Sequence, residues 1–359
     1  MVKDIFESLM KTIIYIITKS EVGGAQTWVR DQTKLFKDDF KQIIITNNEG
    51  WLSVHNYAEK VYFVKEIESK FSIFALFKIL KIFIKEQANT VISSSANAGL
   101  YARLSKIFYK HRSIYVSHGW SCIYNGGKFK SVFIKVEKLL SHLTDTILCV
   151  SDKDAHNAIN IVNINPKKIK VIRNSVFPQQ VRKSKDINYL NILTVGRLSH
   201  PKRFDLLIDA VKDIEGITLT IVGGGPDRGK YDEVSNVKFL GEVKNFSNFH
   251  MYDLFTLISD SEGLPMSAIE AASAGLPLLL SDVGGCSELI DENGFIVKNN
   301  KVDIINKIEL IKSDYSYYNN NAIAIKDSFN IKMNKDKYYT LYSNVYFFYY
   351  NLVFFRFLI

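Results

Sequence analysis

Residues Ser259–Gly285, SDSEGLPMSAIEAASAGLPLLLSDVGG, predict a loop, a helix and a buried strand in succession. The helix begins at Pro265, because the N–H group that proline lacks would be unpaired in the first turn anyway. It ends near Ala274, since Gly275 is typical of the position after a helix and Pro277 prevents continuation. An apolar run precedes the loop, so the stretch indicates one strand–helix–strand unit of a parallel sheet.

Units of this kind extend over both halves of the chain. Short β-rich runs alternate with longer segments of helical period, which is the pattern of parallel α/β sheets. In the first half the expected strands are Thr12–Thr18, Gln42–Thr46, Thr90–Ser93, Ser113–Ser117, Thr146–Val150 and Lys170–Ile172. In the second half they are Asn191–Val195, Thr218–Val222, Val237–Leu240, Leu254–Ile258 and Pro277–Leu280. The polar segment Val176–Asn188 separates the halves, so we expect two Rossmann-like domains with ligands beyond the carboxyl ends of their strands.

The composition is that of an ordinary globular protein of 359 residues, with 47% hydrophobic and 23% charged residues. The length favours two domains and excludes a single small module. The composition excludes a disordered chain. The net charge of +9, from 46 Lys and Arg against 37 Asp and Glu, suits nucleotides, lipid headgroups or nucleic acid. The three cysteines, Cys122, Cys149 and Cys286, are too far apart for a zinc or redox motif, which favours a reducing cytoplasm.

The start of the helix at Pro265 offers an anion site. Its first N–H groups are free and carry a partial positive charge beyond the carboxyl end of a strand. A diphosphate would fit against the residues of this turn, which are Gly263, Leu264, Pro265 and Met266. Glu262 precedes the helix and Glu270 lies about two turns along it, and carboxylates accept hydrogen bonds from paired sugar hydroxyls. Either glutamate alone would be interpreted as a solvated helix charge, but the two together favour a sugar-nucleotide site.

A second strand end in this half favours phosphate binding. In TVGRLSHPKRFDLLIDA, a strand runs up to Gly196, and Arg197 and Lys202 follow before a helix. Two fixed cations there would stabilise the negative charge on a departing diphosphate. Each cation alone would be an ordinary surface charge.

Two glycine turns lie beyond the next strands. In IVGGGPDRG, Gly223 and Gly225 form a strand-to-glycine turn, which is a weak signal alone and is not the GxGxxG fingerprint. Beside the other loops we expect it to shape a nucleotide pocket. The turn from Gly241 to Val243 is expected near the base.

The first half has two more candidates at strand ends. EVGGAQ places Gly24 in a Gly-Gly turn after the first strand, where backbone can approach a phosphate or a sugar. VSHGW places His118 directly after a strand. A lone histidine is more often structural, but this position leaves a catalytic role open.

Motifs of several other enzyme classes are absent from the sequence. Asp152 and Asp154 could bind a divalent metal, but SDKDAHNA favours a helix start with Ser151 or Asp152 as N-cap. The sequence has no GxSxG, Walker A or HExxH motif, which argues against an α/β-hydrolase, a P-loop NTPase and a zincin.

Some apolar segments could meet a membrane. Lys70–Gln87 alternates phenylalanine and lysine with helical spacing, and Lys106–Lys138 adds KIFYKHR and KFKSVFIKVEK. Such a helix most often packs on a sheet, and anionic lipid is the alternative partner. The run Ile13–Ile17 is a strand, because a membrane span needs about 20 apolar residues. The final Tyr346–Ile359 is either buried, or a monotopic membrane contact, or foreign to the fold.

Together these motifs resemble glycosyltransferase family 4, the retaining nucleotide-sugar transferases of the GT-B fold, from Thr12 to Ser343. The resemblance is carried by GGAQ, SHG, RNSV, VGRLSHPKRFDLLIDA, IVGGGP, FLGEV and the stretch from Glu262 to Glu270. Bacterial capsule, lipopolysaccharide and O-antigen transferases share the SDSEG variant. Gln26 and Arg203 depart from the family, which often has Glu and Gly there.

The resemblance implies an α/β fold with two Rossmann-like domains facing each other across a cleft. Residues 1–177 would form the acceptor-binding domain and residues 178–330 the donor-binding domain. Residues 331–359 would return to the first domain and end in the apolar tail. The implied site residues are Glu270 for the ribose, Glu262 for the donor sugar, Arg197 and Lys202 for the diphosphate, Gly24 for the phosphates from the opposite domain, and His118 for the transferred sugar and the acceptor. His118 and Glu262 would be the catalytic residues.

The implied reaction moves a sugar from a nucleotide-sugar donor, with uridine favoured as the base, to a lipid-linked or growing surface glycan. It would retain the anomeric configuration, need no metal or cofactor, involve no nucleic acid and occur at the inner face of the cytoplasmic membrane. Two alternatives stay open: a nucleotide-sugar epimerase, for which no further acid/base set is evident, and a non-catalytic sugar-nucleotide binding subunit, which would tolerate the loss of His118.

Overall fold

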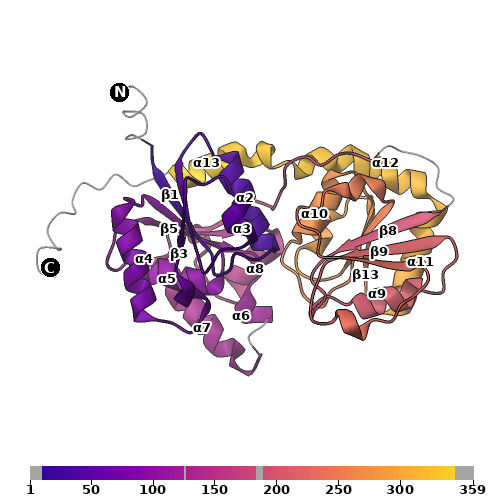
Figure 1. Cartoon of the computed structure of the whole chain (residues 1–359), viewed down its shortest axis with the longest axis horizontal. Helices are drawn as coiled ribbons and strands as arrows, with labels where there is room; N and C mark the ends of the chain where they lie inside the picture. The colour runs from indigo at the N-terminus through magenta and orange to yellow at the C-terminus, as the bar shows by residue number, and fades with distance from the viewer. Residues whose placement is uncertain (1–9, 125–126, 183–188, 344–359) are drawn as a thin grey trace, which may run out of the picture.

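The computed structural model describes residues 10–124, 127–182 and 189–343, which form two parallel β-sheets, one in each half of the chain (Figure 1). The first sheet has seven strands in the order β3-β2-β1-β4-β5-β6-β7. They are β1 (Thr12–Ile16), β2 (Lys41–Thr46), β3 (Lys60–Phe63), β4 (Thr90–Ser93), β5 (Arg112–Ser117), β6 (Thr146–Cys149) and β7 (Ile169–Val171). The interior strand β1, TIIYI, is buried along its whole length, as a parallel strand covered by helices on both faces must be.

The second sheet has six strands in the order β10-β9-β8-β11-β12-β13. They are β8 (Leu190–Val195), β9 (Ile217–Val222), β10 (Val237–Gly241), β11 (Leu254–Leu257), β12 (Leu278–Ser281) and β13 (Gly294–Val297). Both sheets confirm the predicted α/β fold of two Rossmann-like domains. In each sheet the strand order reverses beside the first strand of the domain, and ligands of doubly wound sheets bind beyond the carboxyl ends at that point.

Two strands were missed by the sequence analysis, and both lie at a sheet edge. In β3 the two end residues are exposed and the two middle ones half-buried, so KVYF has no continuous apolar run. β13 is a short strand, GFIV, whose two middle residues are half-buried. An edge strand has one neighbour and is partly covered, so its sequence need not be apolar throughout. The periodicity signal therefore fails there first.

Helices cover the first sheet. They are α2 (Gly24–Leu35), α3 (Trp51–Val54), α4 (Ile73–Lys85), α5 (Ala96–Ser105), α6 (Ser121–Tyr124), α7 (Lys130–Leu140) and α8 (Asp152–Asn160). Within the predicted segment Lys70–Gln87, the hydroxyl of Ser72 accepts a hydrogen bond from the N–H of Ala75 and starts α4. The hydroxyl of Ser151 accepts one from the N–H of Asp154, which confirms the predicted helix start.

The second domain contains α9 (Phe204–Val211), α10 (Met266–Ser273), α11 (Lys301–Ser313) and α12 (Tyr315–Ile325). Pro265 is the N-cap of α10 and Ala274 its C-cap, so the predicted helix boundaries are confirmed. A 3₁₀ helix, η7 (Cys286–Leu289), follows β12.

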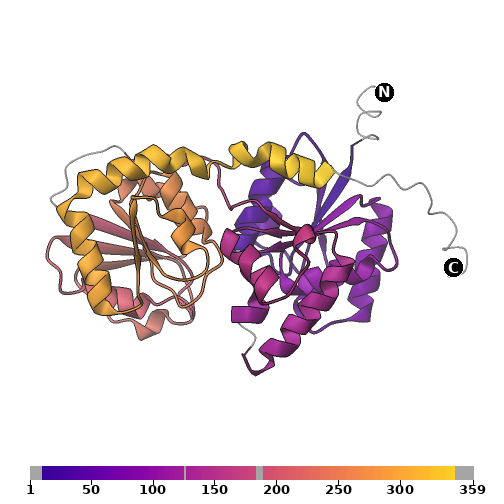
Figure 2. The ribbon, with the colours of Figure 1, turned by 180° about the vertical axis from the view of Figure 1, so that it is seen from behind.

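After α12 the chain leaves the second domain and returns to the first (Figures 1 and 2). Its last described helix, α13 (Lys335–Ser343), packs Tyr338 against Trp28, and the hydroxyl of Tyr342 donates a hydrogen bond of 2.9 Å to Gln32 Oε1. Residues 183–188 of the predicted linker and the apolar tail Tyr346–Ile359 lie outside the described residues.

One hydrophobic cluster extends from the first domain into the second. Trp28 and Val150 contribute to it from the first domain, and Leu264 and Met266 from the second. The domains therefore share a buried apolar contact, which holds the loops at the two sheets' carboxyl ends against each other. Within the described ranges, no helix combines the length and the apolar composition that crossing a bilayer requires.

Candidate functional site

The carboxyl edges of the two sheets meet at a close backbone contact. Gly119 follows His118 at the end of β5, and Gly263 lies in the loop before α10. A Cβ atom on Gly263 would lie 2.3 Å from the carbonyl oxygen of His118, and one on Gly119 would lie 3.2 Å from Gly263 Cα. Gly119 also has a φ of +103°, which side chains rarely adopt. The contact brings predicted residues of the two domains together.

Two helix N-termini lie beside this contact. α2 begins at Gly24, where a Cβ atom would be 3.5 Å from Cγ of Met266, the first residue of α10. In the described part of the chain, neither helix has a side chain hydrogen-bonded to its first turn. Their free N–H groups and partial positive charges make this region suitable for an anion such as a diphosphate.

Lys202 and Glu262 form an ion pair next to the start of α10. Lys202 Nζ donates a hydrogen bond of 2.5 Å to Glu262 Oε1, and the two side chains are 17% and 11% exposed. Lys202 is placed there by a β-bridge to Ser259. A charge pair so poorly hydrated interacts strongly with a nearby ligand. Arg197, the other predicted cation, is exposed, and its guanidinium makes no hydrogen bond or ion pair with the described residues.

Glu270 lies on α10, facing the first domain. Burial and, to a smaller extent, the Asp31 carboxylate on α2 raise the pKa of its carboxyl to about 8, and Arg30 partly offsets this rise. Arg30 Nε donates a hydrogen bond of 2.8 Å to Asp31 Oδ1. Among the described residues, the Glu270 carboxyl has no hydrogen-bond partner. A neutral carboxyl can both donate and accept, so it can bind two adjacent hydroxyls.

His118 is held between two residues of its own domain. Its Nε2 lies 2.7 Å from Ser94 Oγ, and its ring meets the Trp28 ring edge-on with centroids 5.4 Å apart. Burial lowers the pKa of His118 to about 4, so the imidazole is neutral at physiological pH.

The predicted glycine turns allow two loops of the second domain, the one after β8 and the one after β9, to pack closely together. A Cβ atom on Gly223 would lie 1.9 Å from the carbonyl oxygen of Gly196, and one on Gly225 would lie 2.3 Å from that of Leu198. The N–H of Gly223 donates a hydrogen bond of 2.8 Å to the carbonyl of Gly241. Val243 is partly exposed just beyond β10. These residues thus lie side by side at the carboxyl ends of β8–β10.

Sequence reasoning missed an ionic contact that joins the domains behind this site. Glu288, on η7, accepts hydrogen bonds from the N–H groups of Asp152 (3.0 Å) and Lys153 (2.9 Å) at the start of α8. Arg173 Nε lies 3.3 Å from Glu288 Oε2 and also binds Asp152. No local pattern predicts a cap that comes from the other domain. The motif RNSV, which contains Arg173, was the one available signal.

Ser94 was also missed, although a signal for it existed. It directly follows β4, which pairs with β5 in the sheet, so it lies at the same edge as His118. The described residues contain no group of three or more His, Cys, Asp or Glu side chains placed to share a metal ion.

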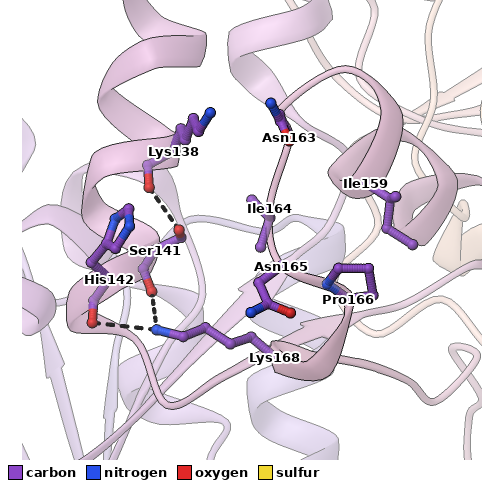
Figure 3. Close-up of a pocket in the computed structure, with 9 residues that line it drawn as sticks. All are labelled: Lys138, Ser141, His142, Ile159, Asn163, Ile164, Asn165, Pro166 and Lys168. Atoms are coloured by element: carbon purple, nitrogen blue, oxygen red, sulfur yellow. Dashed lines mark hydrogen bonds between the residues drawn. The ribbon is translucent and has the colours of Figure 1, made fainter.

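A cavity of about 330 Å³ lies at the opposite edge of the first sheet, before β6 and β7 (Figure 3). It is lined by Lys138, His142, Asn163, Asn165 and Lys168 among others, and by none of the predicted site residues. Lys168 Nζ donates hydrogen bonds to the carbonyls of Ser141 (2.7 Å), His142 (3.3 Å) and Thr144 (2.9 Å), so this lysine closes a helix end.

Comparison with known proteins agrees with this geometry. Residues 22–180 match the family described as Glycosyltransferase Family 4, and residues 190–314 match Glycosyl transferases group 1. The chain is 48% identical over 328 residues to the O-antigen biosynthesis glycosyltransferase WbnH of Escherichia coli, covering 90% of this chain and 96% of WbnH.

More distant relatives share the fold or part of the sequence. The chain is 27% identical over 309 residues to the UDP-Gal:alpha-D-GlcNAc-diphosphoundecaprenol alpha-1,3-galactosyltransferase of Escherichia coli, covering 76% of this chain and 78% of that one. The structure of Anabaena HepE in complex with UDP-glucose superposes with a TM-score of 0.79 at 17% identity, covering 92% of this chain and 99% of HepE.

Proposed function

The chain belongs to the glycosyltransferases of group 1 and family 4, and from that membership we propose that it transfers a sugar from a UDP-linked donor to a lipid-diphosphate-linked glycan in surface polysaccharide biosynthesis. The observation that carries the proposal is the Lys202–Glu262 pair beside the start of α10, directly opposite the start of α2. A relative with a diphosphoundecaprenol acceptor in its name supports the acceptor class.

The donor diphosphate lies between the two helix N-termini in this proposal. Lys202 stabilises the charge that develops on the leaving phosphate, and the exposed side chain of Arg197 can move toward the diphosphate to assist it. The chain's own cations and helix N-termini thus do the work that a divalent metal does in other transferases, so the reaction is metal-independent. Glu262 accepts hydrogen bonds from hydroxyls of the donor sugar, and Glu270 binds the ribose hydroxyls. The sugar is transferred with retention, as the family resemblance implies.

The deciding experiment measures UDP or GDP release from a panel of nucleotide sugars, with and without a synthetic polyprenyl-diphosphate-linked hexosamine. We expect one UDP-sugar to be consumed faster with the acceptor, in EDTA as well as in Mg²⁺, and NMR of the product to show the donor's anomeric configuration. Glu270→Ala should weaken UDP binding about tenfold, the worth of one or two hydrogen bonds. Glu309→Ala, on an exposed glutamate of α11, is the matched control.

Other outcomes would contradict separate parts of the proposal. Conversion of the sugar without nucleotide release would indicate an epimerase. Nucleotide binding without turnover on any acceptor would indicate a binding subunit. Activity lost in EDTA and restored by Mg²⁺ would contradict metal independence, and an inverted product would contradict retention.

We further propose that the first domain rests on an anionic membrane through the outer face of α4 and α7. Along α7 and its N-cap residue, exposed apolar side chains recur at helical spacing: Phe129, Val132, Phe133, Val136 and Leu139. On α4, Phe74 is 74% exposed and Phe77 53%. The interleaved lysines Lys81, Lys85, Lys135 and Lys138 supply the charge that complements acidic headgroups. The three cysteines are unpaired and buried, which suits the reducing cytoplasmic side.

Flotation with vesicles of phosphatidylglycerol and phosphatidylcholine tests this surface. We expect Phe74→Glu with Leu139→Glu to lower the partition coefficient onto the vesicles by about 100-fold, because two large apolar side chains no longer insert. The control pair, Val302→Glu with Leu310→Glu on α11, adds the same charge to exposed apolar positions of the second domain. Wild-type binding should fall at high salt. Equal vesicle binding by the two double variants, or no binding by the wild type, would contradict the proposed membrane-binding surface.

A further inference from the structure

His118 is fixed by its neighbours in a way that leaves one ring nitrogen available. Ser94 and His118 follow the adjacent strands β4 and β5, whose pairing aligns Ser93 with Tyr115. Ser94 is buried, and its N–H donates a hydrogen bond of 3.0 Å to the carbonyl of Ile16, so its backbone cannot shift easily. The buried ring of Trp28 lies edge-on to the imidazole, which restricts rotation of His118.

The hydrogen bond between Ser94 and His118 can run in two directions, and burial distinguishes them. If His118 Nε2–H donates, the proton of the buried Ser94 hydroxyl has no acceptor among the described residues. If the hydroxyl donates to an unprotonated Nε2, both groups are satisfied. A buried donor without a partner is costly, whereas a paired one is not. The second arrangement is therefore the stable one, and it places the ring proton of the neutral imidazole on Nδ1.

Nδ1 is the nitrogen that remains for a substrate. It has no hydrogen-bond partner in the described ranges, and it is not among the polar atoms that are buried without a partner, so it is not fully closed off. The lowered pKa of His118 agrees with a neutral ring. The carbonyl of the same residue faces Gly263, in the loop before α10.

We propose that Ser94 is a positioning residue that holds His118 as the Nδ1–H tautomer, so that His118 donates a hydrogen bond to a sugar hydroxyl oxygen instead of acting as a general base. The tautomer of His118 follows from its hydrogen bond with Ser94 alone. Only the identification of a sugar hydroxyl as the partner of Nδ1 rests on the proposed function. As a hydrogen-bond donor of this kind, His118 neither gives up nor takes up a proton. The acceptor proton is then left to the departing phosphate of the donor.

Two-bond ¹H–¹⁵N correlation spectra of protein labelled with ¹⁵N-histidine test the tautomer without any substrate. The His118 signals are identified by their absence in His118→Gln. We expect a protonated Nδ1 and an unprotonated Nε2 in the wild type. Ser94→Ala should shift the equilibrium toward Nε2–H, and Ser94→Thr, which keeps the hydroxyl, should restore Nδ1–H. Ser113→Ala is the matched control, because Ser113 is a buried serine of β5 whose hydroxyl has no hydrogen-bond partner among the described residues.

Kinetics give the second measurement. Ser94→Ala should lower kcat about tenfold, the value of one oriented hydrogen bond, with little change in donor KM. Ser94→Thr and Ser113→Ala should stay near the wild type. An Nε2–H tautomer in the wild type would overturn the proposal even if Ser94→Ala does not fold. An unchanged tautomer in a folded Ser94→Ala would overturn it too. Absence of transfer activity with the expected tautomer would instead count against the proposed function.

Discussion

Methionine in place of Lys202 is expected to lower kcat by about 10²–10³-fold, the usual effect of removing one group that stabilises transition-state charge. Lys202 Nζ lies 2.5 Å from Glu262 Oε1 in a poorly hydrated position, so its charge is fixed before the reaction and is little screened. Negative charge grows on the diphosphate as it leaves, and methionine keeps the apolar stem but not the cation. Donor KM should change less than kcat, because the charge is greatest in the transition state.

Two further variants separate this effect from a loss of stability. Lys202→Met leaves the Glu262 carboxylate, which is 11% exposed, without its partner, and this costs about 3–5 kcal/mol when such a pair is fully buried. Lys202→Met with Glu262→Gln removes the unpaired charge, so thermal unfolding should return toward the wild type while kcat stays low. Arg203→Met is the neighbouring control, because Arg203 forms exposed pairs with Asp205 and Asp260. Wild-type turnover in a folded Lys202→Met protein would contradict the role of Lys202.

Alanine at Gly263 is expected to lower turnover by about 10²-fold, since a displacement of about 1 Å at a catalytic site has that effect. The new Cβ atom would lie 2.3 Å from the carbonyl oxygen of His118 and 3.0 Å from the N–H nitrogen of Gly119. Both are backbone atoms on the opposite domain, so the clash cannot be relieved by a side-chain rotation. The domains must instead move apart, which separates His118 from Glu262 and the start of α10.

Small-angle scattering and kinetics together test this prediction. Gly263→Ala should have a larger radius of gyration than the wild type and a lower kcat, while circular dichroism shows intact secondary structure. Gly229→Ala is the control, because a Cβ atom there has no neighbour within 4 Å. Unchanged scattering with full activity would mean that the reaction does not depend on this contact.

The sequence was sufficient wherever the determining interactions are local. The boundaries of α10 follow from Pro265, Gly275 and Pro277, and the start of α8 follows from the Ser151 cap, because each signal lies within a few residues of the helix end that it determines. Eleven strands were predicted at nearly their observed positions, and the interior ones among them, such as β1, have apolar runs that are buried on both faces. The same reasoning failed at β3 and β13, two edge strands whose middle residues are only half-buried.

The sequence by itself therefore determined the two-domain α/β fold and the glycosyltransferase family, since both depend on short motifs at strand ends. Only the tertiary structure decided which residues meet: Gly263 with His118, Glu270 with Asp31, Glu288 with α8, and Ser94 with His118. Most of these pairs join segments more than a hundred residues apart, and no local pattern encodes such a distance. Electrostatics and hydrogen bonding act through space, so the protonation of Glu270 and His118 depends on neighbours that folding alone supplies.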